Sequence, residues 1–267
     1  MALAVVPVGF DLPDGPHLSE LRKVGGRTLL EICLKELSDA GQTELVVLVG
    51  PHSGVEVGGY GAETGLHEVS IRHAIEAFGA EVSIAYASRL EQGISELSNR
   101  DILVVWPTDL WRDESPETVF TEAEMKGSVP SETNKQTCIR HVAELMAFLC
   151  HPVVVVENGV DWEISLHACA VERDASNHIV RILDPDICRA MPETLDIIRM
   201  VAGIPAGSFR KLRPDNTFVG WYGSQALFYH LLSDNGKIIA FSEEGKCYDA
   251  RFESQFNAYL ASSASKE

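Results

Sequence analysis

The stretch "KVGGRTLLEICLKELSDAGQTELVVLVG" (residues 23–50) decides the fold class. Within it, residues 28–40 repeat apolar side chains at helical spacing, and Gly41 follows as a left-handed helix end. Residues 44–50 then form a continuous apolar run of strand length. A helix that leads into a strand without polar alternation predicts a parallel sheet that is covered by helices on both faces.

The same alternation continues on both sides of this stretch. Strands are expected at residues 3–8, 81–86 and 101–111, and helices at 65–79 and near 89–98. The first half therefore predicts a three-layer α/β/α, Rossmann-like domain with a mainly parallel mixed sheet. Ligands of such sheets bind beyond the carboxyl ends of the strands.

The second half has a more varied pattern. Residues 113–137 are polar without a sustained period and are expected to form a surface excursion. No linker divides the chain, so we expect a single domain over 1–260 and a flexible tail at 261–267. The other expected elements are helices near 138–149, around 193–202 and at 224–236, strands at 152–157, 162–172, 179–183 and 217–222, and a closing strand, turn and amphipathic helix over 237–260.

Composition and charge narrow the class of partner. The 267 residues include 39 acidic and 22 basic side chains, a formal net charge of −17, which disfavours nucleic acid. The six cysteines show no CxxC spacing, and the start "MALAVVPVGF" has no basic region, so a reduced, cytoplasmic protein is expected. No apolar run approaches the roughly 20 residues of a membrane helix, so no membrane partner is expected.

Residues 23–50 resemble a segment of the sugar-phosphate and choline-phosphate nucleotidyltransferases, in which a V-G-G-R/K-P/T-L-L stretch begins the first long helix. The likeness continues in order along residues 3–260. "DILVVWPTDLW" (101–111) is similar to the family's strand that ends in Gly-Asp, "VERDASNHIVRIL" (171–183) to its hairpin, and "GKIIAFSEEGKCYDARFESQFNAYL" (236–260) to its ending. The resemblance implies a nucleotide-diphospho-sugar transferase-like fold. It also implies an enzyme that joins a nucleoside triphosphate to a phosphorylated sugar or alcohol and releases pyrophosphate.

The resemblance further implies a magnesium site. Magnesium takes one or two carboxylates from protein, while phosphates and water complete its shell. Asp109 matches the family's first metal aspartate, with Thr108 in place of the preceding glycine, and Asp249 matches the second metal aspartate before the last helix. Aspartate is also common in turns and helix caps, which is the alternative role at both positions.

The loop after the first strand departs from the family pattern. The family's turn resembles Gly-x-Gly-Ser/Thr-Arg, whose backbone N–H groups and arginine hold phosphates. Aligning Gly9 with the first glycine places Asp11 on the second and Pro13 on the arginine. A family lysine falls on Ser19, and the lysine for the acceptor phosphate falls near Asp184. A unit charge such as Asp11 would repel a phosphate about 4 Å away by roughly 4 kcal/mol at an effective dielectric near 20, so weakened triphosphate binding is expected.

The remaining candidates complete the implied site. Arg22 and Lys23 are the candidate catalytic cations, since either could replace the missing positive charge. Gly93 occupies roughly the place where the family contacts the base. The candidate nucleotide-binding residues are Gly9, Phe10, Asp11, Gly93 and Thr108.

Three functions of different classes follow from these residues. The first is an active nucleotidyltransferase with Mg²⁺, a nucleoside triphosphate and a phosphorylated small molecule. The second is a catalytically inactive regulatory or scaffold subunit of the same fold. Its partner would be a protein, and the subunit could be part of an oligomer. The third is a metal-dependent glycosyltransferase that binds a sugar nucleotide, although "PTDLW" (107–111) is not the usual Asp-x-Asp.

Overall fold

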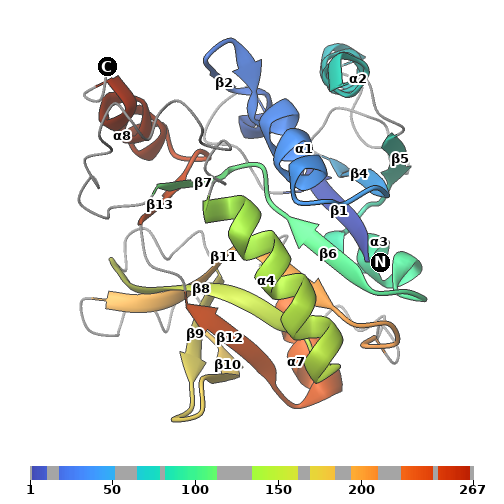
Figure 1. Cartoon of the computed structure of the whole chain (residues 1–267), viewed down its shortest axis with the longest axis vertical. Helices are drawn as coiled ribbons and strands as arrows, with labels where there is room; N and C mark the ends of the chain where they lie inside the picture. The colour runs from blue at the N-terminus through green and yellow to red at the C-terminus, as the bar shows by residue number, and fades with distance from the viewer. Residues whose placement is uncertain are drawn as a thin grey trace, which may run out of the picture.

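A nine-stranded sheet forms the centre of the molecule (Figure 1). Its strands, in the order in which they lie side by side, are β5 (Val82–Tyr86), β4 (Leu45–Val49), β1 (Leu3–Val8), β6 (Ile102–Val105), β11 (Thr194–Ile204), β8 (Val153–Asp161), β12 (Ile238–Ser242), β10 (His178–Ile182) and β9 (Cys169–Arg173). The computed structural model describes residues 2–10, 18–51, 65–78, 82–112, 134–161, 169–183, 194–209, 224–242 and 246–264.

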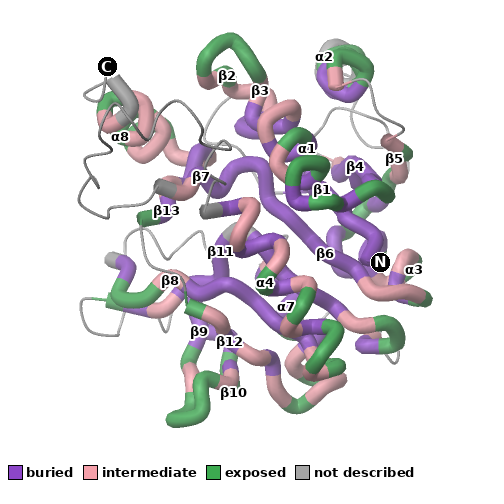
Figure 2. The backbone as a smooth tube through the Cα atoms, viewed as in Figure 1, coloured by how far each residue is buried: buried purple, intermediate pink, exposed green. Residues whose placement is uncertain are grey.

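The first four of these strands are parallel, as their continuous apolar runs predict. Val5 of β1 lies opposite Val46 of β4 on one side and Val104 of β6 on the other. All six residues of β1 are buried, because helices cover both faces of this part of the sheet. Figure 2 shows the same burial along β6 and over Val153–Val156 of β8.

Helices form the two outer layers. The helices α1 (Leu29–Asp39), α2 (Gly65–Phe78) and α4 (Asn134–Leu149) bury their apolar side chains on one face of the sheet, and α3 (Leu90–Leu97) and α7 (Ser224–Asn235) on the other. The three-layer α/β/α prediction is therefore confirmed. None of the helices in the described ranges is both long and apolar enough to span a membrane.

The first long helix begins and ends as its sequence predicts. Thr28 caps α1, with its hydroxyl accepting from the N–H of Glu31 and its own N–H donating to the Glu31 carboxylate. Gly41 follows the helix with a φ of +84°, in the left-handed region. Before the helix, β2 (Lys23–Val24) and β3 (Arg27–Thr28) form a short hairpin around two glycines with positive φ.

The helix expected around residues 193–202 is wrong, because this segment forms β11. The strand pairs antiparallel with β6 on one edge and with β8 on the other. Its sequence "TLDIIRMVAGI" is apolar, and pairing on both edges outweighs the weak helical period that the run contains. β6 pairs with residues 201–204 of β11, and β9 pairs with residues 196–198 of the same strand.

The single strand expected over 101–111 is also wrong, since it is divided in two. β6 ends at Val105, and β7 (Asp109–Arg112) pairs with β13 (Lys246–Asp249) in a separate two-stranded sheet. Pro107 lies between them and has no N–H to continue a ladder of hydrogen bonds. The chain therefore leaves the main sheet just before Asp109.

Other boundaries differ by a few residues. The hairpin of β9 and β10 is confirmed, with Asn177 at a φ of +59° in its turn. α4 begins at Asn134, within the expected polar excursion of 113–137. The last helix, α8 (Glu253–Ala264), continues past residue 260 into the expected tail. The expected strand at 217–222 and most of the polar excursion lie outside the described residues.

Candidate functional site

Asp109 and Asp249 lie directly opposite each other in the β7–β13 pair. Both side chains are buried, and Asp249 has no exposed surface. Like charges in facing positions of an antiparallel pair destabilise it unless a cation lies nearby. The two aspartates proposed as metal ligands are thus brought together and need a positive charge.

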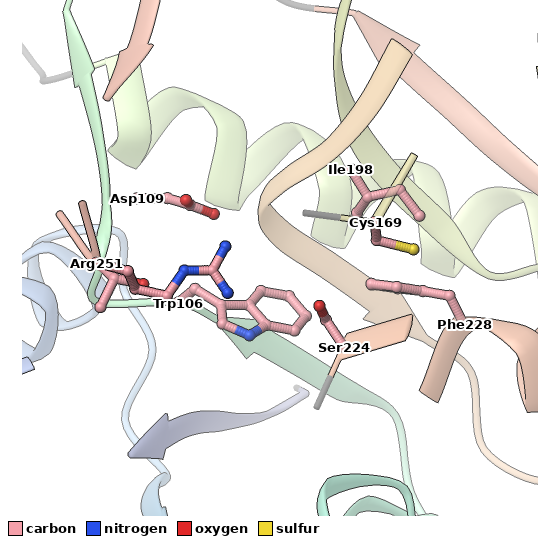
Figure 3. A pocket seen from close by; sticks show the side chains of 8 residues that line it. Trp106, Asp109, Cys169, Ile198, Ser224, Phe228 and Arg251 are labelled. Atoms are coloured by element: carbon pink, nitrogen blue, oxygen red, sulfur yellow. The ribbon is translucent and has the colours of Figure 1, made fainter. Parts of the chain in front are cut away.

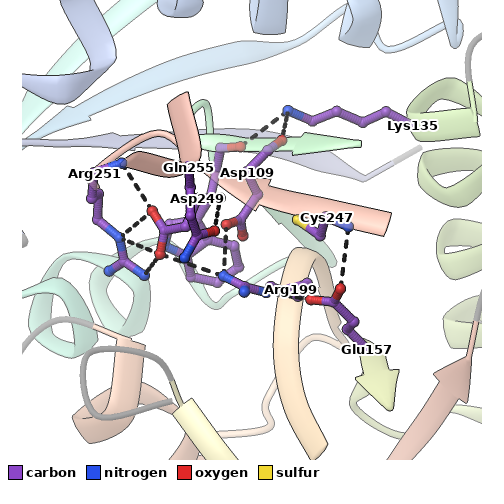
Figure 4. Close-up of polar contacts among 9 residues, drawn as sticks. Asp109, Lys135, Glu157, Arg199, Cys247, Asp249, Arg251 and Gln255 are labelled. Carbon is purple, nitrogen blue, oxygen red and sulfur yellow. Dashed lines mark hydrogen bonds and ion pairs between the residues drawn. The ribbon is translucent and has the colours of Figure 1, made fainter. Parts of the chain in front are cut away.

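Arg199 of β11 supplies that charge (Figure 4). Its Nη1 lies 3.5 Å from Oδ1 of Asp109 and 3.4 Å from Oδ2 of Asp249. Its Nε donates a hydrogen bond of 3.0 Å to Oε2 of Glu157, from β8. Burial alone would lower the pKa of Arg199, but the neighbouring Cys247 and the three carboxylates raise it above its ordinary value, so the side chain stays charged.

Arg251 covers the other side of Asp249. Its guanidinium donates to both carboxylate oxygens of Asp249 over 2.6–3.0 Å, and its backbone N–H donates to Oδ1 at 3.0 Å. Burial alone would raise the pKa of Asp249, but Arg251 and Arg199 outweigh burial, so the pKa lies below its ordinary value. Asp249 is therefore an ion-paired carboxylate.

Glu157 ties the cluster to the neighbouring strand. While its Oε2 accepts from Arg199, its Oε1 accepts a hydrogen bond of 3.2 Å from the N–H of Cys247 in β13. Burial raises the pKa of the Cys247 thiol well above its ordinary value, so the sulfur stays protonated. Three carboxylates from β7, β8 and β13 thus meet one guanidinium from β11.

Lys135, at the start of α4, holds the turn that carries Asp109. Its Nζ donates to the carbonyl oxygens of Trp106 at 3.1 Å and Asp109 at 3.2 Å, and lies 3.5 Å from Oε2 of Glu36. Burial alone would lower the pKa of Lys135, but Glu36 and the other neighbours raise it, so the buried amine is charged. Lys135 therefore fixes the backbone on both sides of Pro107.

The donor set does not fit a magnesium ion as it stands. Asp109 and Asp249 are the right ligand type, but both are paired with Arg199. Over the ranges that the structure describes, no group of three or more His, Cys, Asp or Glu side chains is arranged to hold a metal ion. The place between the two aspartates is taken by a side chain of this protein.

A small pocket lies beside the cluster, where the end of β6, β9, β11 and α7 meet (Figure 3). It is lined by Trp106, Thr108, Asp109, Cys169, Ile198, Ser224, Phe228 and Arg251. Its volume of about 10 Å³ gives room for about one water molecule. Among the residues that the structure describes, this pocket is therefore too small to hold a nucleotide.

The backbone N–H of Gly9, the first group expected to donate a hydrogen bond to a phosphate, is also bonded within the chain. Gly9, with a φ of +72°, donates its N–H at 2.9 Å to Oε1 of Glu20. Glu20 lies in the short 3₁₀ helix η1 (Ser19–Leu21) and is buried. Phe10 is buried in the core, whereas Asp11 lies outside the described residues.

Of the other candidate residues, Thr108 lines the small pocket beside Asp109. The guanidinium of Arg22 lies over the ring of Phe256 in α8, 5.3 Å from its centre. Lys23 is exposed in β2. Thr108 is buried, and its carbonyl accepts from the N–H of Ala250 at 2.8 Å.

Gly93 is a packing position within α3. A Cβ at this residue would lie 2.8 Å from Cβ of Ala87 and 2.8 Å from Cδ2 of Leu48. The glycine therefore allows the helix to approach β4 closely. In this place its backbone faces buried side chains.

Four residues of the cluster escape sequence reasoning, namely Lys135, Glu157, Arg199 and Arg251. Arg199 is a lone charge inside the apolar run "IIRMVAGI" (197–204), and such a charge needs a buried partner. Glu157 ends the run "PVVVVE" in a similar way. These isolated charges are the signal that could have found the cluster.

Comparison with known proteins finds likeness in structure only. No model of a protein family matches the chain, and neither does any curated protein sequence. A UDP-glucose pyrophosphorylase complexed with UDP-glucose is similar with a TM-score of 0.62 and 13% identity, covering 100% of both chains. A UTP-bound UGPase from Acinetobacter baumannii has a TM-score of 0.62 and 15% identity, over 100% of this chain and 95% of that one. HddC from Yersinia pseudotuberculosis complexed with GMP-PN has a TM-score of 0.59 and 9% identity, over 98% and 99%.

These likenesses extend over nearly the whole chain. Together with the sheet order, they show that the chain has the nucleotide-diphospho-sugar transferase-like fold that its sequence predicts. At such low identity they define the fold and leave the chemistry to the residues of the site.

Proposed function

We propose that this chain keeps the fold of the nucleotidyltransferases without metal-dependent nucleotidyl transfer, and acts as a regulatory or scaffold subunit that binds a protein partner. One observation carries the proposal. The guanidinium of Arg199 lies 3.5 Å from Asp109 and 3.4 Å from Asp249, between the two carboxylates that would hold magnesium.

Nucleotidyl transfer needs a cation that bridges the reacting phosphates and neutralises their developing charge. Magnesium could reach this acid pair only by displacing Arg199, whose side chain is 1% exposed and held by Glu157. Breaking a buried ion pair costs about 3–5 kcal/mol, because it leaves a charge without its partner. This cost opposes metal binding before any substrate is considered.

The phosphate end of the site supports the same proposal. Gly9 donates its N–H to the carboxylate of Glu20, which would compete with a phosphate oxygen for the amide. Glu20 is itself buried at this turn, so a carboxylate occupies the place where a phosphate would accept from the backbone. Asp11 and Pro13, which stand where the family has a glycine and an arginine, should also weaken triphosphate binding.

Nucleotidyl transfer remains the second candidate, because Asp109 and Asp249 converge as paired metal ligands would. The UTP-bound and UDP-glucose-bound neighbours share the fold. In this case the substrates are a nucleoside triphosphate and a phosphorylated sugar or alcohol, with Mg²⁺ bound after Arg199 moves away.

A pyrophosphate-release assay separates the two candidates. The purified chain is incubated with Mg²⁺, with each of CTP, UTP, dTTP, GTP and ATP, and with a panel of phosphorylated sugars and alcohols. We expect no turnover and no triphosphate-dependent rise in melting temperature. Turnover that Asp109→Asn abolishes, without loss of folded protein, would establish the second candidate instead.

The regulatory role has its own test. We expect a partner enzyme to form a complex of fixed stoichiometry with this chain. The kcat or KM of that enzyme should change when the chain is added. A chain that stays solitary in its own cells, by native size-exclusion and cross-linking, would contradict the role.

A further inference from the structure

We infer that Arg199 takes the place of a divalent cation, so that Asp109 and Asp249 form a latent metal site that is closed by the chain's own guanidinium. The inference rests on the proposed function and extends it. It identifies the side chain that closes the site, and it states what the site would bind once that side chain is removed.

The acid pair cannot exist at this place without a cation. β7 and β13 put the two carboxylates in facing positions, and both are buried. Arg251 contacts Asp249, while Arg199 contacts both acids. The charge that lies between the carboxylates therefore comes from Arg199.

The guanidinium is held in a fixed position. The pairing of β11 with β8 shifts register between Arg199 and Ala202, an irregularity of the kind that redirects a side chain from a sheet. Glu157 accepts from Nε at 3.0 Å, which leaves Nη1 pointing at the two aspartates. Figure 4 shows the side chain spanning from Glu157 on one side to Asp109 and Asp249 on the other.

Removal of the guanidinium leaves donors that suit a hard divalent cation. Magnesium and manganese bind carboxylate oxygens and need only one or two of them from protein, with water in the other positions. Asp109 and Asp249 would provide these oxygens, Asp249 while it also accepts from Arg251, with Glu157 as a third nearby negative charge. A divalent ion would therefore supply positive charge in place of the guanidinium that the substitution removes.

The test compares Mn²⁺ binding to the wild type and to Arg199→Met, by electron paramagnetic resonance of free Mn²⁺ and by melting temperature. We expect Arg199→Met to bind one Mn²⁺ with a Kd at least about tenfold below that of the wild type. At an ion concentration about a hundred times this Kd, its melting temperature should rise by roughly 5 °C or more. The wild type should show neither response.

Three further variants locate the response. Arg199→Lys keeps a positive charge and should behave as the wild type does. Asp249→Asn in the Arg199→Met background removes one ligand and should abolish the gain. Arg173→Met is the control, since Arg173 is a partly buried arginine of the same sheet whose ion pair is with one acid, Asp196; it should gain no Mn²⁺ site.

Each outcome decides the inference. A folded Arg199→Met chain that gains no Mn²⁺ affinity overturns it, as does a wild type that binds Mn²⁺ through Asp249. If Arg199→Met does not fold alone, refolding is measured with and without Mn²⁺, and equal yields overturn the inference. Turnover by the wild type in the pyrophosphate assay would refute the proposed function, whereas the inference is decided by Mn²⁺ binding, which is measured without substrate.

Discussion

The backbone N–H of Gly9 donates a hydrogen bond of 2.9 Å to Oε1 of Glu20, eleven residues further along the chain. Backbone N–H groups at such a turn are the donors that phosphate-binding loops offer to their ligands. Here the acceptor is a buried carboxylate of the same chain. Gly50 packs behind this turn, and a Cβ there would lie 2.6 Å from the carbonyl oxygen of Gly9. The turn is therefore shaped by contacts within the protein.

Replacement of Glu20 by alanine should lower the free energy of unfolding by about 1–3 kcal/mol, because the buried Gly9 N–H loses its acceptor. Glu20→Gln keeps an oxygen that can accept and should lose less. Urea denaturation of both variants measures the difference. Glu44→Ala is the control, because the Glu44 side chain is 53% exposed and its ion pair with Arg100 should contribute at most about 1 kcal/mol. Equal losses for Glu20→Ala and Glu44→Ala would refute the role of Glu20.

The charges of the Arg199 cluster should be strongly coupled in stability. Arg199→Met alone should cost about 3–5 kcal/mol, because it leaves buried carboxylates without their cation. Adding Asp109→Asn should recover part of this loss, since one of those carboxylates becomes neutral. A double-mutant cycle by urea denaturation at neutral pH, without divalent ions, measures the coupling. If the losses of stability in the two single variants add up to the loss in the double variant, the 3.5 Å contact between Arg199 and Asp109 carries no net energy.

The contribution of Asp249 should disappear in acid. Its pKa in the folded protein lies below the ordinary value of 3.8, so the folded state favours the ionised carboxylate. The stabilisation is therefore fully present above the unfolded pKa and is lost as the pH falls through the lower, folded pKa. The difference in unfolding free energy between the wild type and Asp249→Asn should shrink as the pH drops below 3.8. Urea denaturation at a series of pH values measures it, and a constant difference would contradict the ion-paired state.

Gly93→Ala should destabilise the protein, although alanine is the better helix former by about 1 kcal/mol. The added Cβ would lie 2.8 Å from atoms of both Ala87 and Leu48, and such overpacking typically costs about 1–3 kcal/mol. Gln92→Ala, exposed in the same helix, is the control and should change stability by no more than about 0.5 kcal/mol. A Gly93→Ala protein as stable as the wild type would leave the base-contact hypothesis for Gly93 standing.

Most of the parallel half of the fold can be predicted from the sequence, because its signals are local. The strands at 3–8 and 44–50 are continuous apolar runs, and the helix between them carries its own cap at Thr28 and its own stop at Gly41. The β11 segment gives no such signal. Its apolar run suits a buried helix as well as a buried strand, and only pairing with β6 and β8 decides between them.

Because residues 193–202 are predicted as a helix and not as a strand, the sequence does not place Arg199 at the centre of the candidate site. In a helix, Arg199 would have been one charge on a helical face, whereas in β11 it lies between two strand-end carboxylates. The resemblance had named Asp109 and Asp249, but nothing local to either residue indicates a partner 90 or 50 residues away. Contacts at such separations come from topology, which a single sequence does not record.

The separation of these partners also sets the order in which the molecule can be completed during synthesis. Asp109 leaves the ribosome 90 residues before Arg199, and Asp249 follows Arg199 by 50 residues. Until β13 emerges and pairs with β7, the arginine of a newly made chain lacks one of its buried acids, and Asp109 lacks the strand that covers it. The early strands can assemble before that point. In a newly made chain, the charged centre can therefore close only after the last of the three segments has been synthesised.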